Sequence, residues 1–87
     1  MNKGISRPKS EKTDAQKKQM KSAAEQLIKH LGGLTEASKF LDVKFYVLNG
    51  WRTRGQIPFY QAERISAIDS LNKAGFTFEY MRPDLEN

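Results

Sequence analysis

The sequence has no cysteine and only one histidine, His30, among its 87 residues. Disulfides, thiolate metal sites and multi-histidine metal sites are therefore excluded. No apolar run approaches the roughly 20 residues of a membrane-spanning helix, and none follows the basic N-terminus as it would in a secretory signal. We accordingly expect a cytoplasmic protein that binds no metal, no other cofactor and no membrane.

Catalytic groups are scarce as well. Ser38 and Ser66 have only His30 as a possible base, and the acidic residues are scattered along the chain. No glycine-rich phosphate loop follows a strand pattern. We therefore expect neither an enzyme nor a small-molecule substrate, and we interpret His30 as a favourable group at a helix C-terminus.

Positive charge is in surplus, with a formal net charge of +5. The excess lies in residues 1–30, which hold eight Lys or Arg against three acids. The stretch 43–62 contains no acid but includes Lys44, Arg52 and Arg54. This distribution indicates a polyanionic partner, although a solubilising tail with ordinary surface lysines would produce a similar surplus.

Residues 1–14 are rich in Lys, Ser, Gly and Pro, which predicts a disordered basic arm before a single domain at 15–87. A helix is expected from 15 to 31, capped by Thr13 or Asp14 and ended by glycines. Its apolar residues recur in steps of three and four, which places them on one face. They are Met20, Ala23, Ala24, Leu27, Ile28 and Leu31.

Further helices are expected at 35–41, with Thr35 as its N-cap, and at about 44–52, broken by Gly55. A fourth helix is expected from 58 to 73, starting at the proline, with Ala62, Ile65, Ile68 and Leu71 as its inner stripe. The aromatic tail after Gly75 permits either a strand or one helical turn capped by Thr77, and we favour the turn. The predicted fold is all-α, with four to five helices.

The segment 34–58 has the spacing of a helix-turn-helix. Ala37 and Ser38 are small enough for two helices to cross closely, and Asp42 tolerates the left-handed backbone of the turn. Val43 would wedge between the helices. Leu48 and Trp51 lie three residues apart and would face inward, against the fourth helix and a pair of residues at the end of the first short helix. That pair is Phe40 and Leu41.

The remaining face of helix 44–52 would be the one that meets DNA. The candidate contacts are Lys44, Phe45, Tyr46, Asn49, Arg52, Arg54 and Thr35. Asn49 suits adenine, Lys44 can reach guanine or a phosphate, and Tyr46 can bond a phosphate or pack on a thymine methyl. Arg52 and Arg54 would hold the DNA backbone and set the salt dependence of binding.

The run Phe45-Tyr46-Val47 is unusually apolar for a DNA-facing surface, so Phe45 or Val47 could instead belong to the core or to a protein contact. Gly50 costs about 1 kcal/mol relative to alanine in a helix, although it would allow a sugar-phosphate strand to approach closely. Two other functions therefore stay open. One is a protein–protein module, an anti-repressor or adaptor, that uses residues 45–47. The other is non-specific nucleic-acid binding through the arm.

The stretch GGLTEASKFLDVKFYVLNGWRTRGQIP, a later helix with AERISAI and the ending MRPDL resemble the phage Cro-like and YdaS-like family of DNA-binding regulators. The matching positions are Trp51, Gly55, Ile57, Pro58, Arg82, Pro83 and Asp84. Asp42 and Lys44 depart from the family pattern, which has a glycine and a small capping residue there. The resemblance implies a lambda-repressor-like helix-turn-helix domain that represses transcription by binding double-stranded operator DNA as a homodimer. Phe76, Phe78 and Tyr80 are candidate dimer contacts or core residues.

Overall fold

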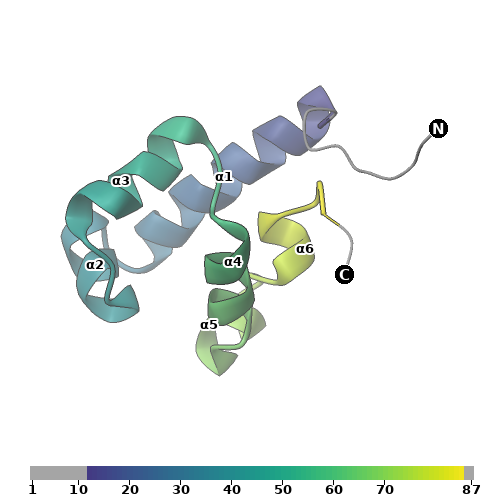
Figure 1. Cartoon of the computed structure of the whole chain (residues 1–87). Coiled ribbons are helices and arrows are strands. Elements are labelled where there is room, and N and C mark those ends of the chain that lie inside the picture. The colour runs from purple at the N-terminus through teal and green to yellow at the C-terminus, as the bar shows by residue number, and fades with distance from the viewer. Residues whose placement is uncertain (1–11, 86–87) are drawn as a thin grey trace.

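The structure, a computed structural model, describes residues 12–85, and the expected arm therefore lies largely outside the described residues (Figure 1). Within that range there are six helices and no strand, which confirms the all-α class but exceeds the expected four to five helices. The helices are α1 (Asp14–His30), α2 (Leu34–Leu41), α3 (Phe45–Arg54), α4 (Phe59–Ser66), α5 (Asp69–Lys73) and α6 (Phe78–Met81). None of the described helices has both the length and the apolar character needed to cross a membrane.

The long helix α1 is the support for the other elements, and it packs against α2, α3 and α6 (Figure 1). It begins at Asp14, inside the segment expected to be disordered, because Thr13 and Gln16 form a capping box. The predicted apolar face is confirmed, since five of its six residues are buried and Leu31 packs at the edge of the core. Helix α1 therefore contributes one continuous face to the hydrophobic core.

The expected N-cap of the second helix was wrong. Helix α2 starts at Leu34, and its N-cap is Gly33 rather than Thr35, which lies exposed in the first turn. Gly32 and Gly33 both have positive φ, and their N–H groups bond to carbonyls at the end of α1. Because its N-cap residue is a glycine, α2 begins without a side-chain cap.

The predicted continuous helix at 58–73 is divided into α4 and α5. Ile68 has an extended backbone, and Asn72 Nδ2 donates to the Ser66 carbonyl at the end of α4. The expected stripe steps by three residues three times, which would rotate Leu71 by about 180° from Ala62 in a straight helix. The break returns Leu71 to the core, while Ile68 lies partly buried against it.

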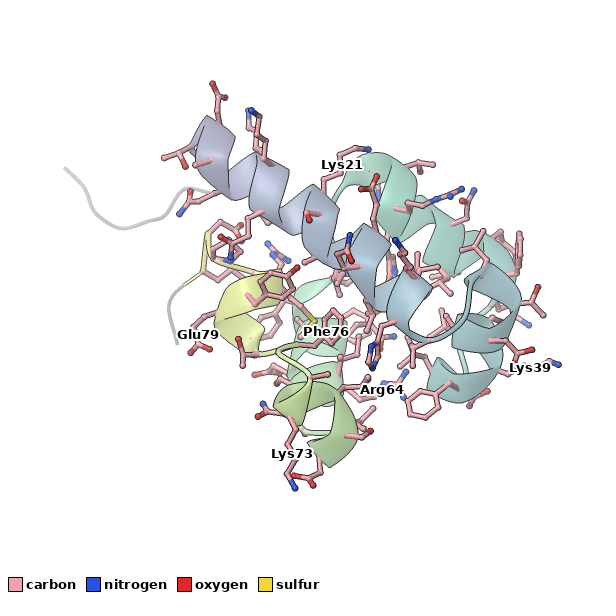
Figure 2. All side chains as sticks on the ribbon, turned by 180° about the vertical axis from the view of Figure 1, so that it is seen from behind. Lys21, Lys39, Arg64, Lys73, Phe76 and Glu79 are labelled. Atoms are coloured by element: carbon pink, nitrogen blue, oxygen red, sulfur yellow. The ribbon has the colours of Figure 1, made fainter. Side chains whose placement is uncertain are left out.

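The tail forms the predicted helical turn, and the strand alternative was wrong. Thr77 Oγ1 accepts the Tyr80 N–H at 3.2 Å and so caps α6. Phe76 and Phe78 are buried, which corrects their candidate role as dimer contacts. Figure 2 shows Phe76 among the central side chains, whereas Lys73 and Glu79 extend outward. The aromatic tail therefore closes one side of the core.

Phe40 was expected in the core beside Leu41, but it is 53% exposed. One step along a helix turns a side chain by about 100°, so burying Leu41 places Phe40 outside the contact with α3.

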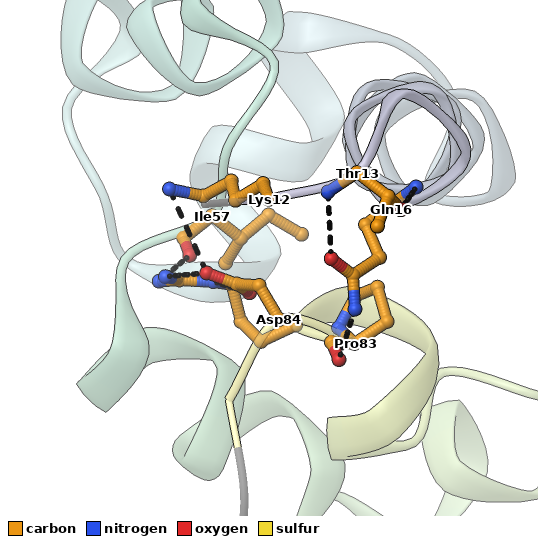
Figure 3. Close-up of polar contacts among 7 residues, drawn as sticks. Lys12, Thr13, Gln16, Ile57, Pro83 and Asp84 are labelled. Carbon is orange, nitrogen blue, oxygen red and sulfur yellow. Dashed lines mark hydrogen bonds and ion pairs between the residues drawn. The ribbon is translucent and has the colours of Figure 1, made fainter. Parts of the chain in front are cut away.

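A buried ion pair fastens the C-terminal segment to the rest of the fold (Figure 3). Arg82 donates through Nε and Nη2 to both Asp84 oxygens, at 3.0 and 2.9 Å, and through Nη1 to the Ile57 carbonyl at 3.1 Å. Lys12 Nζ lies 3.7 Å from Asp84 Oδ2, and Gln16 Nε2 donates to the Pro83 carbonyl. We call the residues Lys12, Gln16, Ile57, Arg82, Pro83 and Asp84 the C-terminal clamp.

The charge of Asp84 is essential to this clamp. Burial alone would raise the pKa of the Asp84 carboxyl, but the hydrogen bonds and positive charge of Arg82, together with Lys12, hold it below its ordinary value of 3.8. A carboxyl with a lowered pKa in the folded state stabilises the fold above its unfolded pKa. That stabilisation is lost as the pH falls through the folded pKa.

We predict that Asp84→Asn lowers the free energy of unfolding at pH 7 by about 1–3 kcal/mol, because Arg82 and Lys12 lose a buried partner. The difference from wild type should begin to shrink as the pH falls below 3.8, and it should be smallest below the lower pKa of the folded wild-type carboxyl, where that carboxyl also becomes neutral. Urea unfolding at several pH values measures both effects. Asp69→Asn is the matched control, since its pair with Lys73 is exposed and should contribute less than about 1 kcal/mol. Equal losses for the two variants would contradict the prediction.

Candidate nucleic-acid interface

Helices α2 and α3 are joined by the three residues between Leu41 and Phe45. Asp42 has φ 56° and ψ 49°, so it adopts the predicted left-handed conformation. Ser38 Oγ donates to the Val43 carbonyl at 2.7 Å, and the Ser38 carbonyl accepts the Val43 N–H at 3.1 Å. These two bonds hold the turn against the last turn of α2 and set the angle at which α3 begins.

The inner face of α3 is anchored as predicted. Leu48 and Trp51 are fully buried, in the same core as Ala37 and Leu41 of α2. Trp51 Nε1 has no hydrogen-bond partner among the described residues, so burial of the large ring has to outweigh the cost of one unpaired donor. Because this face is locked into the core, the opposite face of α3 has a defined orientation at the surface.

The apolar run at the start of α3 lies on that surface. Phe45 is 51% exposed, Tyr46 is 70% exposed and Val47 is 37% exposed. The possibility that Phe45 or Val47 belongs to the core is therefore wrong, because Leu48 and Trp51 alone point inward from this helix. A DNA contact and a protein contact both remain for the exposed rings.

Asn49 and Arg52 are brought together on the outer face. Arg52 Nη2 donates to Asn49 Oδ1 at 2.6 Å, and Asn49 is half-buried while Arg52 is exposed. The bond occupies the acceptor that a two-bond contact with adenine would use. Base contact by Asn49 in the predicted manner therefore requires Arg52 to swing away, which would free the guanidinium to bond a phosphate.

The two ends of α3 carry the other predicted cations. Lys44 is the N-cap and offers no side-chain acceptor, so no side chain caps the first N–H groups of α3. At the other end the helix continues two residues beyond the expected end at Arg52, to Arg54, and is capped by Gly55 in the left-handed conformation. The Arg54 guanidinium lies over Gly50, where an added Cβ would come within 2.8 Å of Nη1. No acidic residue lies on α3.

Five of the seven candidate residues therefore form two groups, while Arg54 lies at the end of α3 and Thr35 lies apart on α2. Lys44, Phe45 and Tyr46 border an open groove of about 500 Å³ between the end of α2 and the start of α3. Asn49 and Arg52 form the central pair, and Thr35 lies in the first turn of α2.

Sequence reasoning missed a third group, in which lysines of α1 meet the C-terminal end of α3. Lys17 and Lys21 line a cavity together with Arg54. Their spacing of four residues was the one available signal in the sequence that these lysines share a face of the first helix. Nothing in the sequence indicated that Arg54 would approach them.

Comparison of the chain with protein-family models, with curated proteins and with solved structures found no match. The resemblance to the Cro-like and YdaS-like family therefore rests on the quoted residues alone.

We predict opposite effects for alanine at the two glycines near Arg54. Gly50→Ala should stabilise the fold by up to about 1 kcal/mol, because its helical backbone suits alanine and only the flexible Arg54 terminus must move. Gly55→Ala should destabilise it by about 1–3 kcal/mol, because φ is +72° and a Cβ would approach Lys21 Cβ to 3.2 Å. Urea unfolding of both variants measures the signs, and a loss of stability for Gly50→Ala comparable to that for Gly55→Ala would contradict the prediction.

Proposed function

We propose that the protein is a sequence-specific DNA-binding transcriptional regulator of the Cro-like type, in which α2 and α3 form a helix-turn-helix. Helix α3 would lie in the major groove of operator DNA, and α2 would support it from above. A homodimer on a near-palindromic site would place two copies of α3 about 34 Å apart. Repression of phage or prophage operators is the outcome that the family resemblance implies.

The observation that carries this proposal is the division of α3 into two faces. Leu48 and Trp51 fix the helix in the core, while the outer side presents Asn49, Arg52 and Arg54 without any acidic residue. A recognition helix needs both properties, because base contacts depend on rigid placement and phosphate contacts depend on unopposed positive charge. The three-residue connection between α2 and α3, with a left-handed residue at its start, has the length that this motif requires.

The exposed rings of Phe45 and Tyr46 support a second candidate function, a protein–protein module. Two large aromatic side chains on consecutive residues at the surface are typical of protein contacts. They also suit thymine methyl groups, so their exposure by itself does not separate the two functions. The positively charged residues of α3 favour DNA binding over the protein–protein module.

We predict that Asn49→Ala weakens binding to a duplex selected from a random pool by about 1–3 kcal/mol, while affinity for random-sequence DNA stays unchanged. Arg54→Ala should weaken both and reduce the salt dependence, with a change of about 0.9 in the slope of log K against log salt for each phosphate that the variant no longer neutralises. Fluorescence anisotropy at several salt concentrations measures these quantities. Equal losses on both duplexes for Asn49→Ala would refute its role in base contact.

The double variant Phe45→Ser/Tyr46→Ser tests the two functions against each other. We predict that wild-type protein retains DNA in a gel shift at physiological salt and micromolar concentration, and that the variant loses most of this retention. Both side chains are exposed, so the variant should keep its helical circular dichroism. Absence of retention by the wild type would favour the protein–protein module.

A further inference from the structure

Four cationic side chains converge on a cavity between α1 and the end of α3. Lys12, Lys17 and Lys21 border it from the α1 side, and Arg54, Gly55 and Gln56 border it from the α3 side. The cavity has a volume of about 320 Å³, and the buried side chain of Met20 is part of its wall. We call it the α1–α3 cavity. Figure 2 shows Lys21 on α1 beside α3, at the opposite end of the molecule from Lys73.

Gly55 brings the end of α3 close to α1 at the wall of this cavity. The residue has no Cβ, and a Cβ built there would lie 3.2 Å from Lys21 Cβ, so the chain passes directly against α1. Its left-handed backbone ends α3 at this point, with the Gly55 and Gln56 N–H groups both bonded to the Trp51 carbonyl. The side chains of Arg54, Lys17 and Lys21 therefore reach the same space from two elements that are far apart in the sequence.

The positive charge around the cavity is only partly compensated. Lys12 pairs with Asp84 at 3.7 Å and Lys21 pairs with Glu25 at 3.8 Å. Lys17 and Arg54 have no carboxylate partner among residues 12–85. The Glu25 pair is exposed on both sides, so it is weak and can exchange for a stronger anion. An anion in this cavity would meet several ammonium and guanidinium donors and the amide of Gln56.

We propose that the α1–α3 cavity binds a backbone phosphate of double-stranded DNA next to the segment that α3 contacts. The inference rests on the proposed function, since Arg54 belongs both to α3 and to the cavity and so joins the two surfaces. A phosphate suits the site because lysine and arginine are its usual protein partners. Lys17 and Lys21 are one helical turn apart, about 6 Å along α1, so they extend the positive surface of α3 along the DNA backbone.

The test compares Lys17→Gln/Lys21→Gln with Lys29→Gln/Lys73→Gln. Both variants lose two lysine charges, and neither alters α3. Lys29 lies at the other end of α1, and Lys73 lies on α5. The probes are two 30-base-pair duplexes, one selected by the wild-type protein from a random pool and one of random sequence. Urea unfolding confirms that both variants are folded.

We expect the cavity variant to bind both duplexes about tenfold more weakly at 100 mM salt. Its slope of log K against log salt should fall by about 0.9, because the cavity neutralises one phosphate and each neutralised phosphate contributes about 0.9 to the slope. The ratio of affinities for the two duplexes should stay at the wild-type value, since α3 is intact. The control variant should match wild-type protein in all three quantities.

Phosphate ethylation interference supplies a second readout. In the wild-type complex, ethylation of phosphates at the flank of the site should weaken binding, and this interference should disappear in the cavity variant but persist in the control. If wild-type protein binds DNA and the two variants behave alike, the cavity proposal is overturned while the proposed function stands. If wild-type protein binds neither duplex, both are overturned.

Discussion

The buried guanidinium of Arg82 is the constraint on which the arrangement of the helices depends. A charge removed from water is tolerated only while its partners stay in place, and here those partners are Asp84 and the Ile57 carbonyl. Ile57 belongs to the connection between α3 and α4, while Asp84 also meets Lys12 before α1. The clamp therefore holds the C-terminal segment, the exit from α3 and the start of α1 in one arrangement. Helix α3 itself ends at the left-handed Gly55, two residues before Ile57.

The position of the C-terminal end of α3 determines which charged residues lie together at the surface. Because Gly55 passes directly against α1, cations from α1 and from α3 share one region. The other end of α3 carries exposed aromatic rings and Lys44 beside an open groove. Helix α3 thus joins an aromatic region to a cationic one, with the Asn49–Arg52 pair between them. This order supports the proposed binding of a duplex, which would offer methyl groups and base edges in the groove and phosphates at its borders.

Much of the fold could be predicted from local pattern, and the errors have identifiable causes. The stripe of α1, the left-handed Asp42, the inward pair Leu48 and Trp51, and the Thr77 cap all follow from residue spacing or backbone preference. The N-cap of α2 was wrongly assigned to Thr35 because Gly33 occupies that position and the helix starts at Leu34. The prediction of one helix at 58–73 was wrong because apolar residues spaced by three positions do not stay on one face of a straight helix. Three such steps rotate the last side chain by about 180° from the first. For the candidate interface, the cations of α3 were identified, but not the bond between Asn49 and Arg52.

By itself, the sequence determined the helical class, the apolar faces, the acid-free stretch around α3 and the lack of any cysteine or multi-histidine metal site. These properties depend on residue type and on spacing within one helix. Only the tertiary structure decided that Arg82 bonds the Ile57 carbonyl, that Phe76 and Phe78 are core residues, and that Lys17, Lys21 and Arg54 border one cavity. The reason is physical: these contacts join segments that are distant in the chain. Their geometry is set by how whole helices pack, which no local pattern specifies.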